Sequence, residues 1–150
     1  MTSRVLLAVF LAAFISPSIQ TVAQQPGPTV QVYKSPTCGC CANWVKHLQA
    51  HGFKTEVTEV KDISDIKKDH KIPGPAQSCH TATVDGYVIE GHVPAADVQR
   101  LLKERPRVLG LAVPGMPLGS PGMEVPNMKA DPYDVVSFDE AGQIHVFASH

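Results

Sequence analysis

The feature that most constrains the fold is an alternation of strand and helix patterns that begins near residue 29. Residues 29–33 alternate polar with strand-forming side chains, and residues 53–60 do so again. Between these runs, Cys41, Val45 and Leu48 are spaced i, i+4 and i+7, which predicts a helix with one apolar face. Because a helix that connects neighbouring strands places them parallel, we predict a parallel pair here.

The next segment predicts antiparallel strands beside that pair. We expect a short helix over 63–70, a hairpin over 80–90 and a further helix over 94–105. Asp85-Gly86 between two strand patterns is a strong signal for the tight turn of a hairpin, and proline at the start of the last helix suits a first helical turn. The resulting order, β-α-β-α-β-β-α, is that of the thioredoxin-like fold in the α/β class.

The C-terminal extension, residues 107–150, differs in composition. Residues 108–131 are rich in proline and glycine and hold every methionine except the initiator, so we predict an irregular loop that wraps the domain. Strand patterns at 135–138 and 144–147 predict a terminal hairpin. A chain of 150 residues suits one compact domain, which we place at 29–150.

The N-terminus has the pattern of a secretory signal. Arg4 precedes an apolar run over 5–15, and small residues around 21–23 follow. Because the run is shorter than the roughly 20 residues of a membrane span, we predict a signal peptide over 1–23 and a short lead over 24–28. The mature protein would be exported, without a stable membrane span. An uncleaved anchor or a buried helix is the alternative.

The charge balance bears on partners. The chain has 13 basic and 14 acidic side chains, without the basic excess typical of nucleic-acid binding. We therefore expect no nucleic-acid partner.

Four cysteines, Cys38, Cys40, Cys41 and Cys79, are the candidate chemical groups. Three are crowded where the first strand gives way to a helix, and a helix N-terminus lowers thiol pKa values and favours thiolates. A disulfide among them would stabilise little, because the stabilisation grows with loop length. In a thioredoxin-like fold, the loop before the hairpin abuts the C-x-x-C and usually carries a cis-proline. Cys79 occupies that place, so its proximity to the other three depends on the fold.

Four soft sulfurs suit copper(I), zinc or an iron–sulfur cluster. Zinc fits least well, because the adjacent Cys40 and Cys41 are awkward ligands for one tetrahedral ion. An iron–sulfur site in an exported protein usually needs assembly before export. Copper(I) accepts two or three ligands and tolerates thiolates that bridge several ions, so crowding favours it.

Further ligands are available from the methionines and histidines. The thioethers of Met116 and Met123 are soft, and the imidazole of His80 adjoins Cys79, so each could complete a copper site. The alternatives are core packing for the methionines and ordinary hydrogen bonding for His80 and His92.

Two functions fit these residues. One is copper(I) binding, for storage or for transfer to partners. The other is enzymatic: a thiol–disulfide oxidoreductase, with Cys38 as nucleophile and Cys41 as resolving thiol, or a protein that moves electrons between copper states. A purely structural interaction domain would leave the crowded cysteines unexplained.

Several separated motifs accompany the cysteines. They are, in chain order, Ser35–Cys41, Ser78–Ala82, Gly86-Tyr87, Glu90–Pro94, Gly110–Pro117 and Gly119–Glu124. In these motifs the chain resembles the CopG-type copper-resistance proteins of bacterial periplasms, from about residue 30 to its C-terminus. The resemblance implies a thioredoxin-like fold, a periplasmic location and a role in copper tolerance beside other copper-handling proteins. It also implies a polynuclear copper(I) centre bridged by Cys38, Cys40, Cys41 and Cys79, with a role in copper redox handling.

Overall fold

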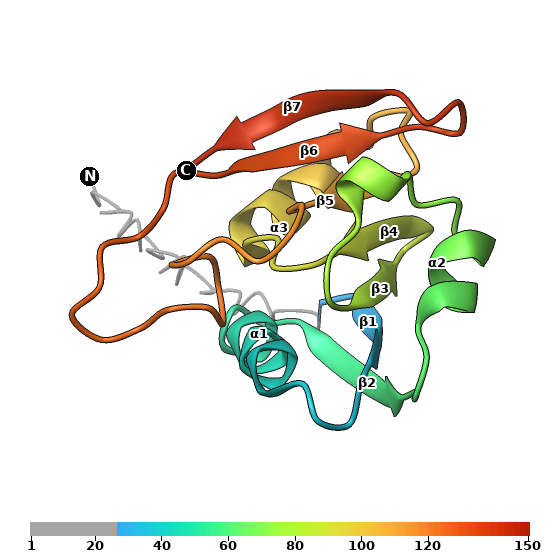
Figure 1. Cartoon of the computed structure of the whole chain (residues 1–150). Coiled ribbons are helices and arrows are strands. Elements are labelled where there is room, and N and C mark those ends of the chain that lie inside the picture. Colours follow the sequence, from blue (N-terminus) through green and yellow to red (C-terminus); the bar gives the residue numbers. More distant parts are fainter. Residues whose placement is uncertain (1–26) are drawn as a thin grey trace, which may run out of the picture.

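The computed structural model describes residues 27–150, and it has one mixed seven-stranded sheet with helices on both faces (Figure 1). The strand order is β2-β1-β3-β4-β5-β6-β7. The strands are β1 (Thr29–Lys34), β2 (Lys54–Glu59), β3 (Thr81–Val84), β4 (Tyr87–Glu90), β5 (Gly110–Ala112), β6 (Asp134–Phe138) and β7 (Ile144–Ser149). The helices are α1 (Gly39–Ala50), α2 (Ser64–Asp69), α3 (Ala95–Glu104) and the 3-10 turn η1 (Gly74–Ala76).

The parallel pair predicted at the start of the chain is confirmed. β1 pairs with β2 in parallel, with Val32 opposite Val57, and α1 connects them. The predicted apolar face of α1 is buried, and the single tryptophan, Trp44, is fully buried beside it. β2 is the sheet edge, and its side chains are mostly exposed.

The predicted central hairpin is also confirmed. β3 and β4 are antiparallel, and β3 is antiparallel to β1 on its other side. Asp85 and Gly86 both have positive φ, 50° and 89°, as the mirror-image turns of two-residue hairpins require. Pro94 caps α3 rather than lying in its first turn.

The prediction of an irregular loop over 108–131 was wrong at its beginning. Residues 110–112 form β5, which pairs in parallel with β4 and antiparallel with β6. Three residues that begin with glycine are too few to show a strand period. Gly110 also allows close approach, because a Cβ there would clash with the Val88 carbonyl. The terminal hairpin β6–β7 is confirmed, and it extends the same sheet.

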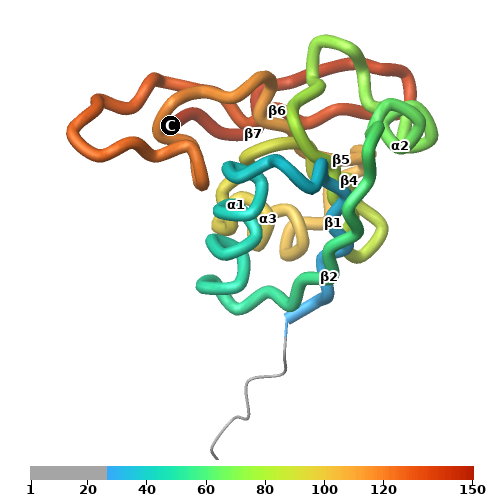
Figure 2. The backbone as a smooth tube through the Cα atoms, turned by 60° about the horizontal axis from the view of Figure 1, so that its bottom comes forward, coloured from blue at the N-terminus to red at the C-terminus, as the bar shows by residue number. Residues whose placement is uncertain are grey.

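The helices divide between the two faces of the sheet. α1 and α3 lie side by side over one face, and α2 lies over the other (Figure 2). The larger apolar cluster joins α1 and α3 to the sheet through side chains that include Trp44, Leu48 and Leu101. The smaller cluster, around Ile72 and Phe138, lies on the opposite face. The sheet therefore lies between two apolar cores.

Two predictions about the N-terminus fall largely outside the described residues. The signal peptide over 1–23 and the beginning of the lead over 24–28 belong to the part that the structure does not describe. Within residues 27–150, none of the helices has the length and apolar character needed to cross a membrane.

Candidate metal and redox site

The first three cysteines lie at the N-terminus of α1. Cys38 is the N-cap residue, and its Sγ accepts a long hydrogen bond of 3.3 Å from the backbone N–H of Cys41. The backbone N–H of Cys38 donates to Ser35 at 3.1 Å, which closes the turn before the helix. Gly39, the first residue of α1, is not among the glycines with positive φ.

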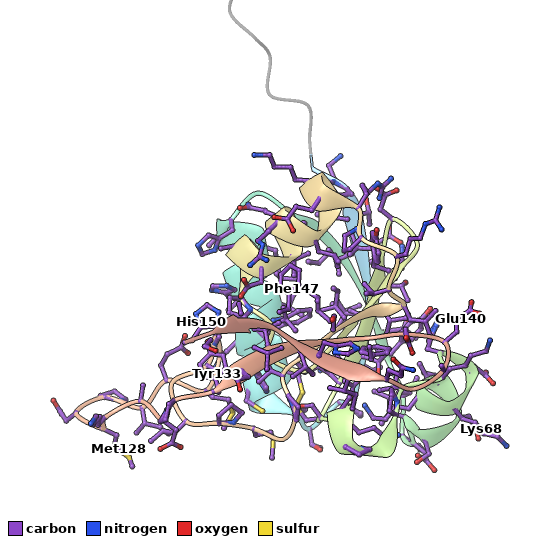
Figure 3. The ribbon with its side chains drawn as sticks, turned by 90° about the horizontal axis from the view of Figure 1, so that it is seen from above. Lys68, Met128, Tyr133, Glu140, Phe147 and His150 are labelled. Atoms are coloured by element: carbon purple, nitrogen blue, oxygen red, sulfur yellow. A yellow bond between two sulfur atoms is a disulfide. The ribbon has the colours of Figure 1, made fainter. Side chains whose placement is uncertain are left out.

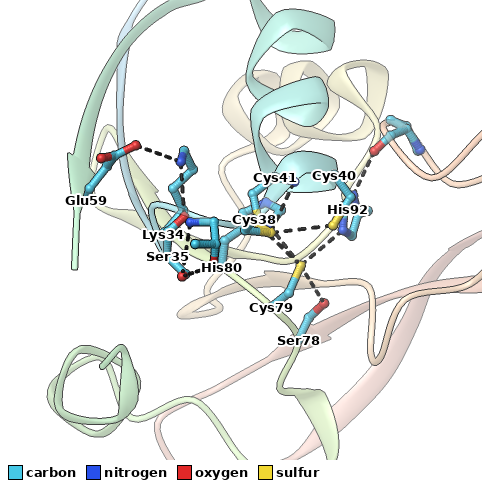
Figure 4. Close-up of a disulfide and its surroundings, with 12 residues drawn as sticks. Lys34, Ser35, Cys38, Cys40, Cys41, Glu59, Ser78, Cys79, His80 and His92 are labelled. Atoms are coloured by element: carbon cyan, nitrogen blue, oxygen red, sulfur yellow. Dashed lines mark hydrogen bonds and ion pairs between the residues drawn. A yellow bond between two sulfur atoms is a disulfide. The ribbon is translucent and has the colours of Figure 1, made fainter. Parts of the chain in front are cut away.

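The four sulfurs meet at this helix end, as the fold-dependent prediction for Cys79 required (Figure 4). Cys38 and Cys41 are joined by a disulfide, whereas Cys40 and Cys79 are free. Cys40 Sγ lies 3.5 Å from Cys38 Sγ, and Cys79 Sγ lies 3.6 Å from Cys41 Sγ. All four sulfurs lie within 4.8 Å of one another. Cys79 and Cys41 are 38 residues apart in sequence, so this proximity is produced by the fold.

A buried ion pair holds the segment that carries Cys79. Glu90, at the end of β4, accepts hydrogen bonds from the Ser78 backbone N–H at 2.6 Å and from the Thr81 hydroxyl at 2.7 Å. Lys67 of α2 pairs with the same carboxylate, and both side chains are buried. Burial raises the pKa of Glu90, and Lys67 and the two hydrogen bonds offset part of that rise. Glu90 thus holds Cys79 from both sides.

Neither member of this ion pair was predicted from the sequence. Lys67 lies in a short, polar helix, and Glu90 ends a strand pattern. Nothing in their separation of 23 residues indicates that the two charges meet. The local signals for Glu90 are its place at the start of the motif Glu90–Pro94 and its position directly after Val88-Ile89 in a strand pattern.

Two histidines contact Cys79 from the interior of the protein. His80 Nδ1 lies 3.3 Å and His92 Nε2 lies 3.1 Å from Cys79 Sγ. Both imidazoles are fully buried. His80 was a predicted candidate. His92 was expected to be an ordinary polar group, and its place in the motif Glu90–Pro94 was the signal that could have found it.

Burial sets the protonation of this interior side. It raises the pKa of the Cys79 thiol to about 11, with a further contribution from Cys40. The expectation of a thiolate therefore does not extend to Cys79 in the metal-free protein. Burial also lowers the pKa of His92, and lowers that of His80 well below its ordinary value, so both imidazoles are neutral near pH 7.

The C-terminal extension packs against the site through a tight turn at 119–123. The carbonyl of Pro121 lies 2.8 Å from His92 Nδ1. Gly122 lies so close to α1 that a Cβ would be 2.7 Å from the Cys40 carbonyl oxygen. Met123 closes this turn by donating to Ser120 at 2.7 Å, and its side chain is half-buried.

The other two methionines of the loop are exposed. Met116 is 54% and Met128 is 60% exposed. Met128 projects at the far end of the loop, away from the sheet (Figure 3). Core packing is therefore excluded as the explanation for Met116 and Met128.

Comparison with known proteins assigns the chain to a family. Residues 76–123 match a family model described as a protein of unknown function, DUF411. No curated protein matches the chain. Two solved structures, described as copper resistance protein CopG, form 2 and form 1, are each 45% identical to it, with TM-scores of 0.77. The alignments cover 82% and 83% of this chain and 98% of each solved chain. The chain therefore belongs to the CopG copper-resistance protein family.

Proposed function

We propose that the protein is an exported, periplasmic copper(I)-binding protein that acts in copper resistance. Its ligands would be Cys38, Cys40, Cys41 and Cys79. The observation that carries the proposal is the convergence of four sulfurs within 4.8 Å of one another. Thiolates are the soft ligands that copper(I) prefers, and the two solved CopG structures are named for copper resistance.

A polynuclear centre is the form of binding that we favour. Four sulfurs this close can each bridge two copper(I) ions, and bridging would reduce the repulsion between neighbouring thiolates. The N-terminus of α1 adds a partial positive charge beside three of them. Copper would be received from, or passed to, other periplasmic copper-handling proteins.

The fold that we propose for this centre is thioredoxin-like. The strand order β2-β1-β3-β4, with β1 parallel to β2 and antiparallel to β3, supports it. So does the position of the cysteines between β1 and α1. In this interpretation β5, β6 and β7 are an addition to the thioredoxin-like unit.

A second candidate function is supported by the Cys38–Cys41 disulfide. Two electrons and two protons would convert it into two thiols, and the reverse reaction would return the electrons to an acceptor. A thiol–disulfide oxidoreductase would use Cys38 as nucleophile and Cys41 as resolving thiol. Copper ions could serve as the one-electron partners of the same pair, which would make the protein a copper redox enzyme.

Anaerobic copper(I) titration of the fully reduced protein tests the main proposal. We expect more than one tightly held copper(I) per chain, competitive with a strong chelator, and protection of all four thiols from alkylation. Less than one tightly held copper per chain, with four reactive thiols, would contradict the proposal.

Replacing Cys40 and Cys79 by serine separates the two functions. A plain oxidoreductase needs only Cys38 and Cys41 and should keep its disulfide-reducing activity, whereas a four-sulfur copper centre should lose most of its copper. Met116→Leu, Met123→Leu and His80→Gln test the additional ligands. Met128→Leu is the matched control, because Met128 is the most exposed of the three methionines in the loop.

A further inference from the structure

The interior side of Cys79 has a donor set that the four-sulfur centre does not use. Cys79 Sγ, a nitrogen of His80 and a nitrogen of His92 lie within 4.8 Å of one another. His80 precedes β3 and His92 follows β4. The backbone N–H of Gly91 donates to the His80 carbonyl at 3.0 Å, which keeps the two ends of the hairpin together. The hairpin therefore places both imidazoles beside one sulfur.

The tautomer of His92 is determined by its contact with Pro121. A backbone carbonyl can only accept a hydrogen bond, so Nδ1, at 2.8 Å from the Pro121 oxygen, carries the proton. Nε2 of the neutral ring therefore has a free lone pair, and it is directed at Cys79 Sγ, 3.1 Å away. Metal-binding histidines usually have this arrangement, in which one nitrogen donates to a carbonyl and the other faces the ion.

His80 cannot be fully satisfied without a further partner. The single proton of the Cys79 thiol can be donated to His80 Nδ1 or to His92 Nε2, but not to both. His80 Nε2 is buried and has no hydrogen-bond partner among the described residues. A buried polar atom without a partner costs about 1–3 kcal/mol. A cation between the sulfur, His80 Nδ1 and His92 Nε2 would replace the shared proton and use both lone pairs that face Cys79, while His80 Nε2 would stay without a partner.

The Cys38–Cys41 disulfide leaves the donor set of Cys79, His80 and His92 intact, whereas it removes two thiolates from the four-sulfur set. Two of the four sulfurs are bonded to each other and are no longer thiolates, whereas Cys79 is free. We propose that, in the disulfide form, Cys79, His80 and His92 bind a single copper(II) ion. This inference rests on the copper role proposed above and extends it to the oxidised protein.

These donors are able to hold copper(II). One thiolate and two imidazoles in a trigonal arrangement form the strong ligand set of protein sites that stabilise a copper(II)–thiolate bond. Binding displaces one proton: the Cys79 S–H bond is lost, a sulfur–copper bond forms and the proton goes to solvent. The two donor sets share Cys79, so reduction of the disulfide would exchange a nitrogen-rich site for a sulfur-rich one.

The test uses the disulfide form of Cys40→Ser, in which Cys79 is the only free thiol of the chain. Copper(II) then has no second thiol with which to form an intramolecular disulfide. We add one equivalent of copper(II) without oxygen and record the visible spectrum and pulsed EPR. We expect one copper(II) per chain, an intense thiolate-to-copper absorption band and magnetic coupling to two imidazole nitrogens.

Histidine variants in the same background identify the ligands. His92→Gln and His80→Gln should each weaken binding at least about tenfold, because even second-shell changes cost about 10–100-fold. His145→Gln is the matched control, since that side chain is exposed on β7. In the disulfide form of Cys40→Ser, absence of the thiolate-to-copper absorption band would overturn the inference. Magnetic coupling of copper(II) to fewer than two imidazole nitrogens would do the same, and neither result needs the histidine variants. Preferential occupation by zinc(II) when both ions are supplied at equal concentration would also overturn it.

Copper(I) loading of the reduced wild-type protein distinguishes the two proposals. If reduced protein binds copper(I) while oxidised Cys40→Ser shows no copper(II)–thiolate band, only the inference of a copper(II) site at Cys79, His80 and His92 fails. If reduced protein binds no copper(I), the proposed function fails, whatever the oxidised form does.

Discussion

The two segments that bring the cysteines together are held in different ways. The Cys38–Cys41 segment is local: a turn, a helix N-terminus and a three-residue spacing place its sulfurs. The segment Ser78–His80 has no regular structure of its own, and side chains from α2 and β4 hold it. The geometry of the Cys38–Cys41 half of the site is therefore determined by a short stretch of sequence. The other half depends on a buried polar network, which should make it the more vulnerable half.

The largest expected effect comes from removing one charge of that network. Glu90→Gln keeps the size of the side chain but leaves Lys67 buried without a counter-charge, which should cost about 3–5 kcal/mol in the free energy of unfolding. Chemical denaturation measures the loss. Hydrogen exchange should also become faster at Ser78 and Cys79 while α1 keeps its protection.

The double variant Lys67→Met with Glu90→Gln is the control for this prediction. Removing both charges should recover most of the lost stability, because no buried charge is left uncompensated. Equal loss in the single and double variants would contradict the role given to the pair. Faster exchange throughout α1 would contradict the independence of the two segments.

A smaller effect is expected where the C-terminal extension contacts the α1 segment. Gly122 has a φ of +88°, and a Cβ there would lie 2.7 Å from the Cys40 carbonyl oxygen and 2.7 Å from the backbone nitrogen of Trp44. Gly122→Ala should therefore cost about 1–3 kcal/mol from overpacking, in addition to the strain of a left-handed backbone.

Gly142→Ala is the matched control in thermal or chemical unfolding. Gly142 has a φ of +75°, and a Cβ added there would have no atom within 4 Å, so this variant reports the backbone strain alone, about 1–2 kcal/mol. If both variants lose the same stability, the extension does not press on α1. The stability of the Cys38–Cys41 segment would then not depend on its contact with the C-terminal extension.

The smallest effect concerns pH and the interior side of Cys79. Burial lowers the pKa values of His80 and His92 below 6.5, so the unfolded chain binds more protons than the folded one in acid. Stability should therefore fall as the pH falls through 6.5, by at most about 1.4 kcal/mol per histidine and pH unit.

Urea denaturation of the metal-free disulfide form between pH 7.5 and about pH 6 measures this slope. His80→Gln should flatten it, whereas His145→Gln, at an exposed position, should leave it unchanged. A stability that rises on acidification would contradict the statement that His80 and His92 are buried as neutral imidazoles. The histidine side of Cys79 would then not differ in protonation from the side that faces the other three cysteines in the way described above.

Most of the secondary structure followed from local patterns. The period of α1, the Asp85-Gly86 turn and the two terminal strand patterns each lie within about a dozen residues, so short-range sterics and burial determine them. β5 did not follow from a local pattern, because three residues that begin with glycine become a strand only when β4 and β6 pair with them.

The sequence by itself determined the crowding of Cys38, Cys40 and Cys41 at the start of a helix, since their spacing and the flanking patterns are local. Only the tertiary structure decided what faces Cys79. Lys67, Glu90 and His92 come from separate elements, and they meet because the sheet brings the ends of β3 and β4 against α1 and α2. Hydrogen bonds and ion pairs act over a few ångströms in space whatever the separation along the chain, so no local pattern could have shown that these three residues meet around the Cys79 segment.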